Sequence, residues 1–145
     1  MAGDIFQTLE NMKNFPVKQT NLQRAKDFRI YTIAMLIADG LSLIPITDET
    51  KRRRLLDIGG PLYDIGEMAH GMKTKNNGND GEAGYYSNDT ENHSNSNITN
   101  HDIAVIHSTH PTKPRPFLLN SAIRFENEKD DAIIDKAFDD FWSRV

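Results

Sequence analysis

The sequence predicts a small, single-domain, predominantly helical α+β protein. Apolar residues recur at helical spacing in several segments, whereas only two short segments near the C-terminal third favour strands. Between these parts lies a polar tract, residues 73–102, which contains eight asparagines. Without the tract about 115 residues remain, which is enough for one hydrophobic core but too few for two.

A first short helix is expected over residues 4–12, because three apolar side chains share one face: Ile5, Leu9 and Met12. Phe15 precedes a proline, Pro16, and therefore ends that helix, since a residue before proline avoids helical geometry. Two further helices are expected downstream. One begins at Thr47 and stops before Gly59, and the other covers residues 62–70.

Residues 28–46 are open to two interpretations. A helix would begin at a capping box formed by Thr20 and Gln23 and would stop at the Asp39-Gly40 pair. A hairpin would instead use that pair as its turn, with a strand on either side. We favour the helix because it has both a cap and a stop, and because Pro45 argues against a central strand.

The tract 73–102 is expected to be disordered and to loop out of the domain. Only four of its residues would contribute to a core: Ala83, Tyr85, Tyr86 and Ile98. Such a composition buries too little apolar surface to offset the ordering of the backbone, which costs about 1–2 kcal/mol per residue. The tract divides the chain into a helical part, residues 1–72, and a part that completes the same domain, residues 103–145.

The C-terminal part is expected to combine two strands with one helix. Residues 103–107 and 117–125 favour strands, and a stiff connector containing Pro111, Pro114 and Pro116 joins them. Residues 130–145 form the clearest helix of the chain, because apolar side chains follow one stripe along it. The stripe consists of Ile134, Phe138, Phe141, Trp142 and Val145.

This stripe is the strongest candidate for a functional surface. Phe138, Trp142 and Val145 fall at positions i, i+4 and i+7, and three carboxylates flank them: Asp135, Asp139 and Asp140. The pattern resembles the acidic, aromatic helices of transactivation-type peptides, which dock into a groove of a partner. The alternative is that the stripe packs on the protein's own core. The sequence predicts a non-enzymatic regulatory or accessory protein that binds another protein through this stripe; no cofactor is expected, and homo-oligomerisation stays open.

Two weaker clusters define alternative functions. His101, Asp102, His107 and His110 offer imidazole and carboxylate groups, which would suit a small metal-assisted hydrolase or phosphoesterase. The basic cluster would contact nucleic acid, although four consecutive helical residues point around more than one face; it consists of Lys51, Arg52, Arg53 and Arg54. The net charge of −4 disfavours general attraction to phosphates.

Composition also bears on location. The chain has no cysteine, which excludes disulfides, thiol catalysis and thiolate metal sites, and which fits a reducing compartment. The longest apolar run, residues 33–38, has six residues, far fewer than the roughly 18 of a membrane span. The first residues show no secretory signal. We expect an intracellular protein, cytoplasmic or nuclear, that is neither secreted nor transmembrane.

Overall fold

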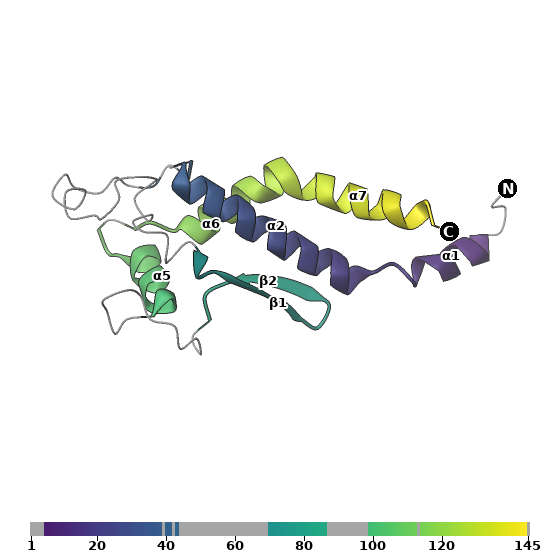
Figure 1. The fold of residues 1–145 in the computed structure, drawn as a ribbon, viewed down its shortest axis with the longest axis horizontal. Coiled ribbons are helices and arrows are strands. Elements are labelled where there is room, and N and C mark those ends of the chain that lie inside the picture. The colour runs from purple at the N-terminus through teal and green to yellow at the C-terminus, as the bar shows by residue number, and fades with distance from the viewer. Residues whose placement is uncertain are drawn as a thin grey trace.

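The computed structural model describes residues 5–38, 40, 41, 43, 70–86, 99–112 and 114–144. Over these residues the protein is predominantly helical and contains one two-stranded antiparallel sheet, which confirms the predicted class (Figure 1). The helices expected from Thr47 and over residues 62–70 lie outside the described residues, except for His70. The elements in chain order are helices α1 (Ile5–Met12) and α2 (Val17–Ile37), strands β1 (Lys73–Asn77) and β2 (Asp80–Gly84), helices α5 (Asn100–Thr109) and α6 (Phe117–Phe125), a π-helical turn η1 (Glu126–Asp130), and helix α7 (Asp131–Trp142).

Helix α2 is the central element, and it confirms the helix rather than the hairpin over residues 28–37. The expected capping box is wrong, because α2 begins one turn earlier, directly after Pro16. Proline suits that position because it has no N–H that the first turn would leave unsatisfied. Gln23 instead donates a hydrogen bond to Asp27 at 3.0 Å, along the side of the helix.

A β-hairpin lies at the start of the tract that was expected to be disordered. Strands β1 and β2 pair with Asn77 opposite Asp80, so Gly78 and Asn79 form a two-residue turn. Gly78 adopts a φ of 62°, in the left-handed region that such turns require. The expectation of disorder is therefore wrong for residues 73–84, because α2 supplies the packing surface that the hairpin's own polar residues lack. Residues 87–98 lie outside the described residues.

Helices replace both strands expected in the C-terminal part. Helix α5 covers residues 103–107 and begins at a capping box, in which Thr99 and Asp102 each accept a hydrogen bond from the other's backbone N–H at 3.2 Å. Helix α6 occupies residues 117–125 and continues through η1 into α7. Short apolar runs fit a strand or a helix equally well. Here the capping box favours the helix at residues 103–107, and the continuation into η1 and α7 favours it at residues 117–125. The helix predicted over residues 130–145 is confirmed as α7.

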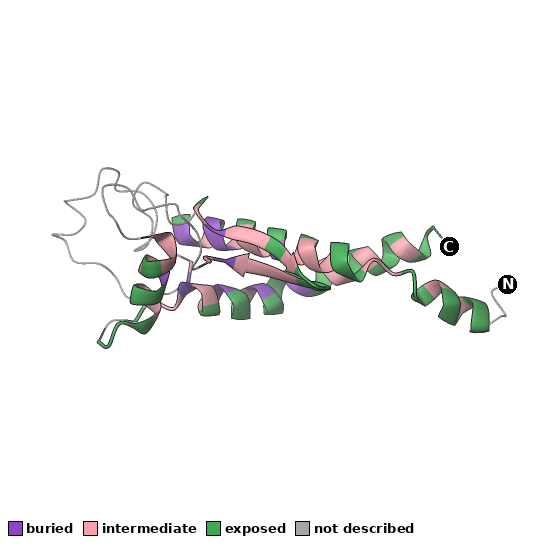
Figure 2. Ribbon diagram, turned by 90° about the horizontal axis from the view of Figure 1, so that it is seen from below, coloured by how far each residue is buried: buried purple, intermediate pink, exposed green. Residues whose placement is uncertain are grey.

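The hydrophobic core lies where the C-terminal half of α2 meets the hairpin, α5 and α6, at the end of the molecule away from α1 (Figure 2). Its buried residues are Ile33, Leu36, Leu41, Leu43, Met72, Ala104 and Phe117. Beside them the hydroxyls of Thr32 and Ser121, both fully buried, share a hydrogen bond of 2.5 Å that joins α2 to α6. Burying these hydroxyls costs little because each satisfies the other.

A partly buried ion pair ties η1 to α2. Arg24 donates from Nε to Oδ1 of Asp130 at 2.7 Å and from Nη2 to Oδ2 at 2.5 Å, so the contact is bidentate. Asp130 is only 7% exposed, and its hydrogen bonds raise the pKa of the Arg24 guanidinium. This pair joins residues 106 positions apart and orients the start of α7 along α2.

Gly81 marks the closest approach of the hairpin to α2 and gives a test of this packing. A Cβ atom at Gly81 would lie 2.0 Å from the carbonyl oxygen of Asn21. We therefore expect Gly81→Ala to push β2 away from α2 and to lower the free energy of unfolding by about 2–3 kcal/mol. Urea unfolding followed by far-UV circular dichroism measures the change.

Gly78→Asn is the matched control, because nothing lies within 4 Å of a Cβ there and asparagine tolerates the left-handed conformation. It should change the free energy of unfolding by less than about 1 kcal/mol. Equal losses in the two variants would contradict the close approach at Gly81.

Candidate interaction surface

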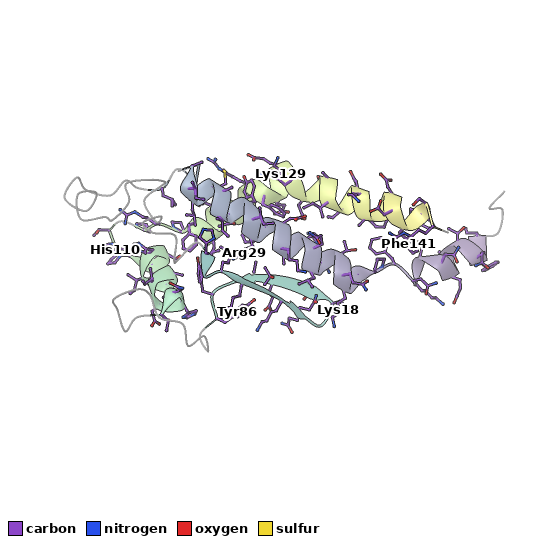
Figure 3. All side chains as sticks on the ribbon, viewed as in Figure 1. Lys18, Arg29, Tyr86, His110, Lys129 and Phe141 are labelled. Carbon is purple, nitrogen blue, oxygen red and sulfur yellow. The ribbon has the colours of Figure 1, made fainter. Side chains whose placement is uncertain are left out.

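The predicted aromatic stripe of α7 lies at the end of the molecule next to α1 (Figure 1). Phe15, in the connection between α1 and α2, stacks on Phe138 with ring centroids 4.5 Å apart and meets Phe141 edge-on at 5.4 Å. Phe141 points toward this connection (Figure 3) and packs on Trp142 at 5.1 Å. One side of the stripe is thus covered by the protein's own Phe15, a contact that the sequence analysis did not include.

The cover over the stripe is incomplete. Ile134 and Phe141 are half-buried, whereas Phe138 and Trp142 remain 43% and 40% exposed. No residue of α7 is fully buried. Val145, the last residue of the predicted stripe, lies outside the described residues. The stripe of α7 is therefore neither wholly packed on the protein's own core nor wholly exposed, since part of it packs on Phe15 and part faces solvent.

Helix α1, which lies near the end of α7 (Figure 1), carries a second exposed apolar face. Its side chains Ile5, Leu9 and Met12 share one face and are 64%, 51% and 50% exposed, and none of its residues is buried. The N–H of Phe15 donates to the carbonyl of Met12 at 3.2 Å, so α1 leads directly into the residue that covers the stripe. We name the exposed set the apolar end; it consists of Ile5, Leu9, Met12, Phe138 and Trp142.

Carboxylates border the exposed side of the stripe. Three exposed ones follow one another at four-residue spacing on the same side of α7 as Phe138: Asp131, Asp135 and Asp139. On another side of the helix, Asp140 pairs with Lys136 at 2.6 Å, and this hydrogen bond lowers the pKa of the Asp140 carboxyl. Residues 126–142 carry seven acidic and two basic side chains, so the field beside the apolar end is negative.

The candidate metal ligands do not converge. His101 Nδ1 lies 3.9 Å from Oδ1 of Asp102, whose carboxylate already caps α5. His107 is six residues further along the helix and on another face, and Nδ1 of His110 accepts from the N–H of Thr112 at 3.2 Å. Within the described ranges no three histidine, aspartate or glutamate side chains are placed to hold a metal ion. The hydrolase or phosphoesterase alternative gains no support from this arrangement.

The other predicted site is the basic cluster, residues 51–54, which lies outside the described residues, so nucleic-acid binding there stays a prediction. None of the described helices is long and apolar enough to cross a membrane. Comparison of the chain with protein-family models, curated proteins and solved structures finds no match.

The cap of α5 makes a pH-dependent contribution to stability. The backbone N–H and the side chain of Thr99 lower the pKa of Asp102. A carboxyl whose pKa is lowered by folding stabilises the folded state above its ordinary pKa, about 3.9, and this stabilisation is lost as the pH falls through the lowered value. Asp102→Asn should therefore speed amide hydrogen exchange in α5 at neutral pH and have little further effect in strong acid.

Asp135→Asn serves as the control for this experiment, because Asp135 is also an exposed helical carboxylate but lies on α7. It should leave exchange in α5 unchanged at every pH. If Asp102→Asn and the parent protein exchanged α5 amides at the same rate at neutral pH, the capping interpretation would be wrong.

Proposed function

We propose that this protein is a non-enzymatic interaction module that binds a basic, amphipathic helix of a partner protein at its apolar end. The observation that carries the proposal is the half-covered stripe of α7. Phe15 holds Phe138 in place by stacking, yet Phe138 and Trp142 keep 43% and 40% of their surface exposed. Large aromatic side chains that are already ordered lose little entropy on binding and supply much contact area.

The charge around the stripe selects the partner. The carboxylates of Asp135 and Asp139 border the exposed aromatic rings, and the nearest basic side chain of α7, Lys136, is already paired with Asp140. A helix that covers the rings with apolar side chains at i, i+4 and i+7 would bring its flanking lysines or arginines opposite these carboxylates. Such rim charges favour the right partner and speed association more than they raise affinity.

Helix α1 provides a second reason to expect a partner here. It has eight residues, whereas isolated helices shorter than about 12–15 residues are marginal in water. Its apolar face is exposed rather than packed on α2. A partner helix lying against α1 and α7 would cover that face and would stabilise α1 on binding.

Trp142 gives a direct test, because it is the only tryptophan of the chain. The probe is a designed helical peptide with leucines on one face and lysines on both flanks. We expect it to shift the Trp142 fluorescence to the blue, and we expect the same peptide with glutamates in place of lysines to bind at least tenfold more weakly. Phe138→Ala should weaken binding by about tenfold, which corresponds to about 1.4 kcal/mol.

Ile30→Ala provides the matched control, since Ile30 is 63% exposed but lies in the second half of α2, fifteen residues after Phe15. It should leave the affinity unchanged, and circular dichroism should show that both variants stay folded. The proposal fails if the lysine and glutamate peptides bind equally well, or if Ile30→Ala weakens binding as much as Phe138→Ala does.

A further inference from the structure

A cleft of about 890 Å³ runs along strand β2, between the hairpin and helix α6. The hairpin and α6 both pack on α2 (Figure 1), so α2 contacts both walls of the cleft. Apolar side chains line its interior: Ala25, Phe28, Leu118, Ala122 and Phe125. Phe28 and Phe125 meet edge-on at 5.5 Å, which holds these two rings in fixed positions.

Strand β2 turns one backbone edge toward this cleft. Within the described chain the sheet has two strands, so β2 pairs only with β1. Asn77 and Asp80 enclose the two-residue turn, and for this reason they must exchange both of their ladder hydrogen bonds. Alternation along the ladder then directs the N–H and C=O groups of Gly81 and Ala83 away from β1, and both residues line the cleft.

The side chains at the edge of the cleft are mostly acidic. Four carboxylates line it, from Asp80, Glu82, Glu126 and Asp130, against one guanidinium, from Arg24. Arg24 and Asp130 balance each other in their ion pair, so the net charge of the rim comes from Asp80, Glu82 and Glu126. The cleft therefore combines a strand edge, an apolar interior and a negative rim.

We propose that this cleft binds an extended, basic peptide segment, which adds to β2 as a third strand. Backbone hydrogen bonds to Gly81 and Ala83 would supply affinity, as in other cases of strand addition. Apolar side chains of the peptide would contact Phe28 and Phe125, and basic side chains would face the carboxylates of the rim. The five residues of β2 span about 17 Å, which matches a peptide of about five residues. This site is separate from the apolar end and takes a strand rather than a helix.

The test uses a fluorescently labelled peptide of alternating lysine and valine, titrated with the full chain and followed by fluorescence anisotropy. All valine N–H groups of such a strand point to one side and all lysine N–H groups to the other. Two N-methylated versions, one methylated on the valines and one on the lysines, therefore remove the donors of one side each. We expect only one of them to lose affinity, by at least tenfold, and the other to bind within about threefold of the parent peptide.

Loss of affinity in both versions, or in neither, would overturn the strand-addition proposal, because docking through side chains alone does not distinguish the two sides. Failure of the parent peptide to bind would also overturn it. Light scattering tests whether a second copy of the chain occupies the same edge. A dimer that dissociates into monomers when the peptide is added would support strand addition at β2. It would also show that the natural occupant is a second copy and not a foreign peptide, which would overturn that part of the proposal.

Variants of the protein complete the test. Ala83→Pro removes an N–H that points away from β1, so the ladder should survive while the peptide binds at least tenfold more weakly. Glu82→Lys leaves the backbone intact and should weaken the lysine peptide several-fold but strengthen a peptide of alternating glutamate and valine. If Glu82→Lys left both affinities unchanged, the rim would play no part in recognition. Phe138→Ala should leave this binding unchanged, which separates the outcome from that at the apolar end.

Discussion

Helix α2 packs against both the hairpin and α6, and small residues at these two contacts make the arrangement possible. Gly81 brings β2 so close to the backbone at Asn21 that no Cβ atom fits between them. At the contact with α6, the hydroxyls of Thr32 and Ser121 are buried and hydrogen-bond to each other. Larger residues at these positions would force the layers apart, since protein interiors have little free volume. The cleft between the hairpin and α6 exists because both walls are held against α2.

The direction of α7 depends on the Arg24–Asp130 ion pair together with the π-helical turn. The turn adds one residue to the helix and so rotates the following residues relative to α6. Asp130 then meets Arg24, and further along α7 the ring of Phe138 meets Phe15. The pair joins a buried carboxylate to a guanidinium that is only partly buried, and its two parallel hydrogen bonds fix the direction in which η1 meets α2. That orientation decides which side of the stripe is covered and which stays exposed.

Periodicity predicted α1 and α7, where apolar positions recur on one face, whereas α2 was favoured for its cap and its stop, of which the cap was wrong. It was wrong at residues 103–107 and 117–125, because runs this short and rich in β-branched or aromatic residues suit either type of structure. Signals for the correct structure were present, since Thr99 and Asp102 have the spacing of a capping box and Asn77-Gly78 that of a hairpin turn. The asparagine-rich composition of the tract concealed both signals. The hairpin is stabilised by contacts with α2, whose residues lie far earlier in the chain, and local composition cannot predict such contacts.

The stripe of α7 was predictable from spacing, but its partial cover was not, because the position of Phe15 depends on how α1 joins α2. The structure also shows where the negative charge of the chain is concentrated. Residues 126–142 hold seven acidic and two basic side chains, whereas residues 1–72 carry nine of each. Glu126 and Asp130 border the cleft, and Asp135 and Asp139 border the apolar end. One continuous helical segment thus places carboxylates beside both proposed binding surfaces. Each would therefore favour basic ligands and lose affinity for them in added salt, while the shapes of the two surfaces would distinguish a helix from a strand.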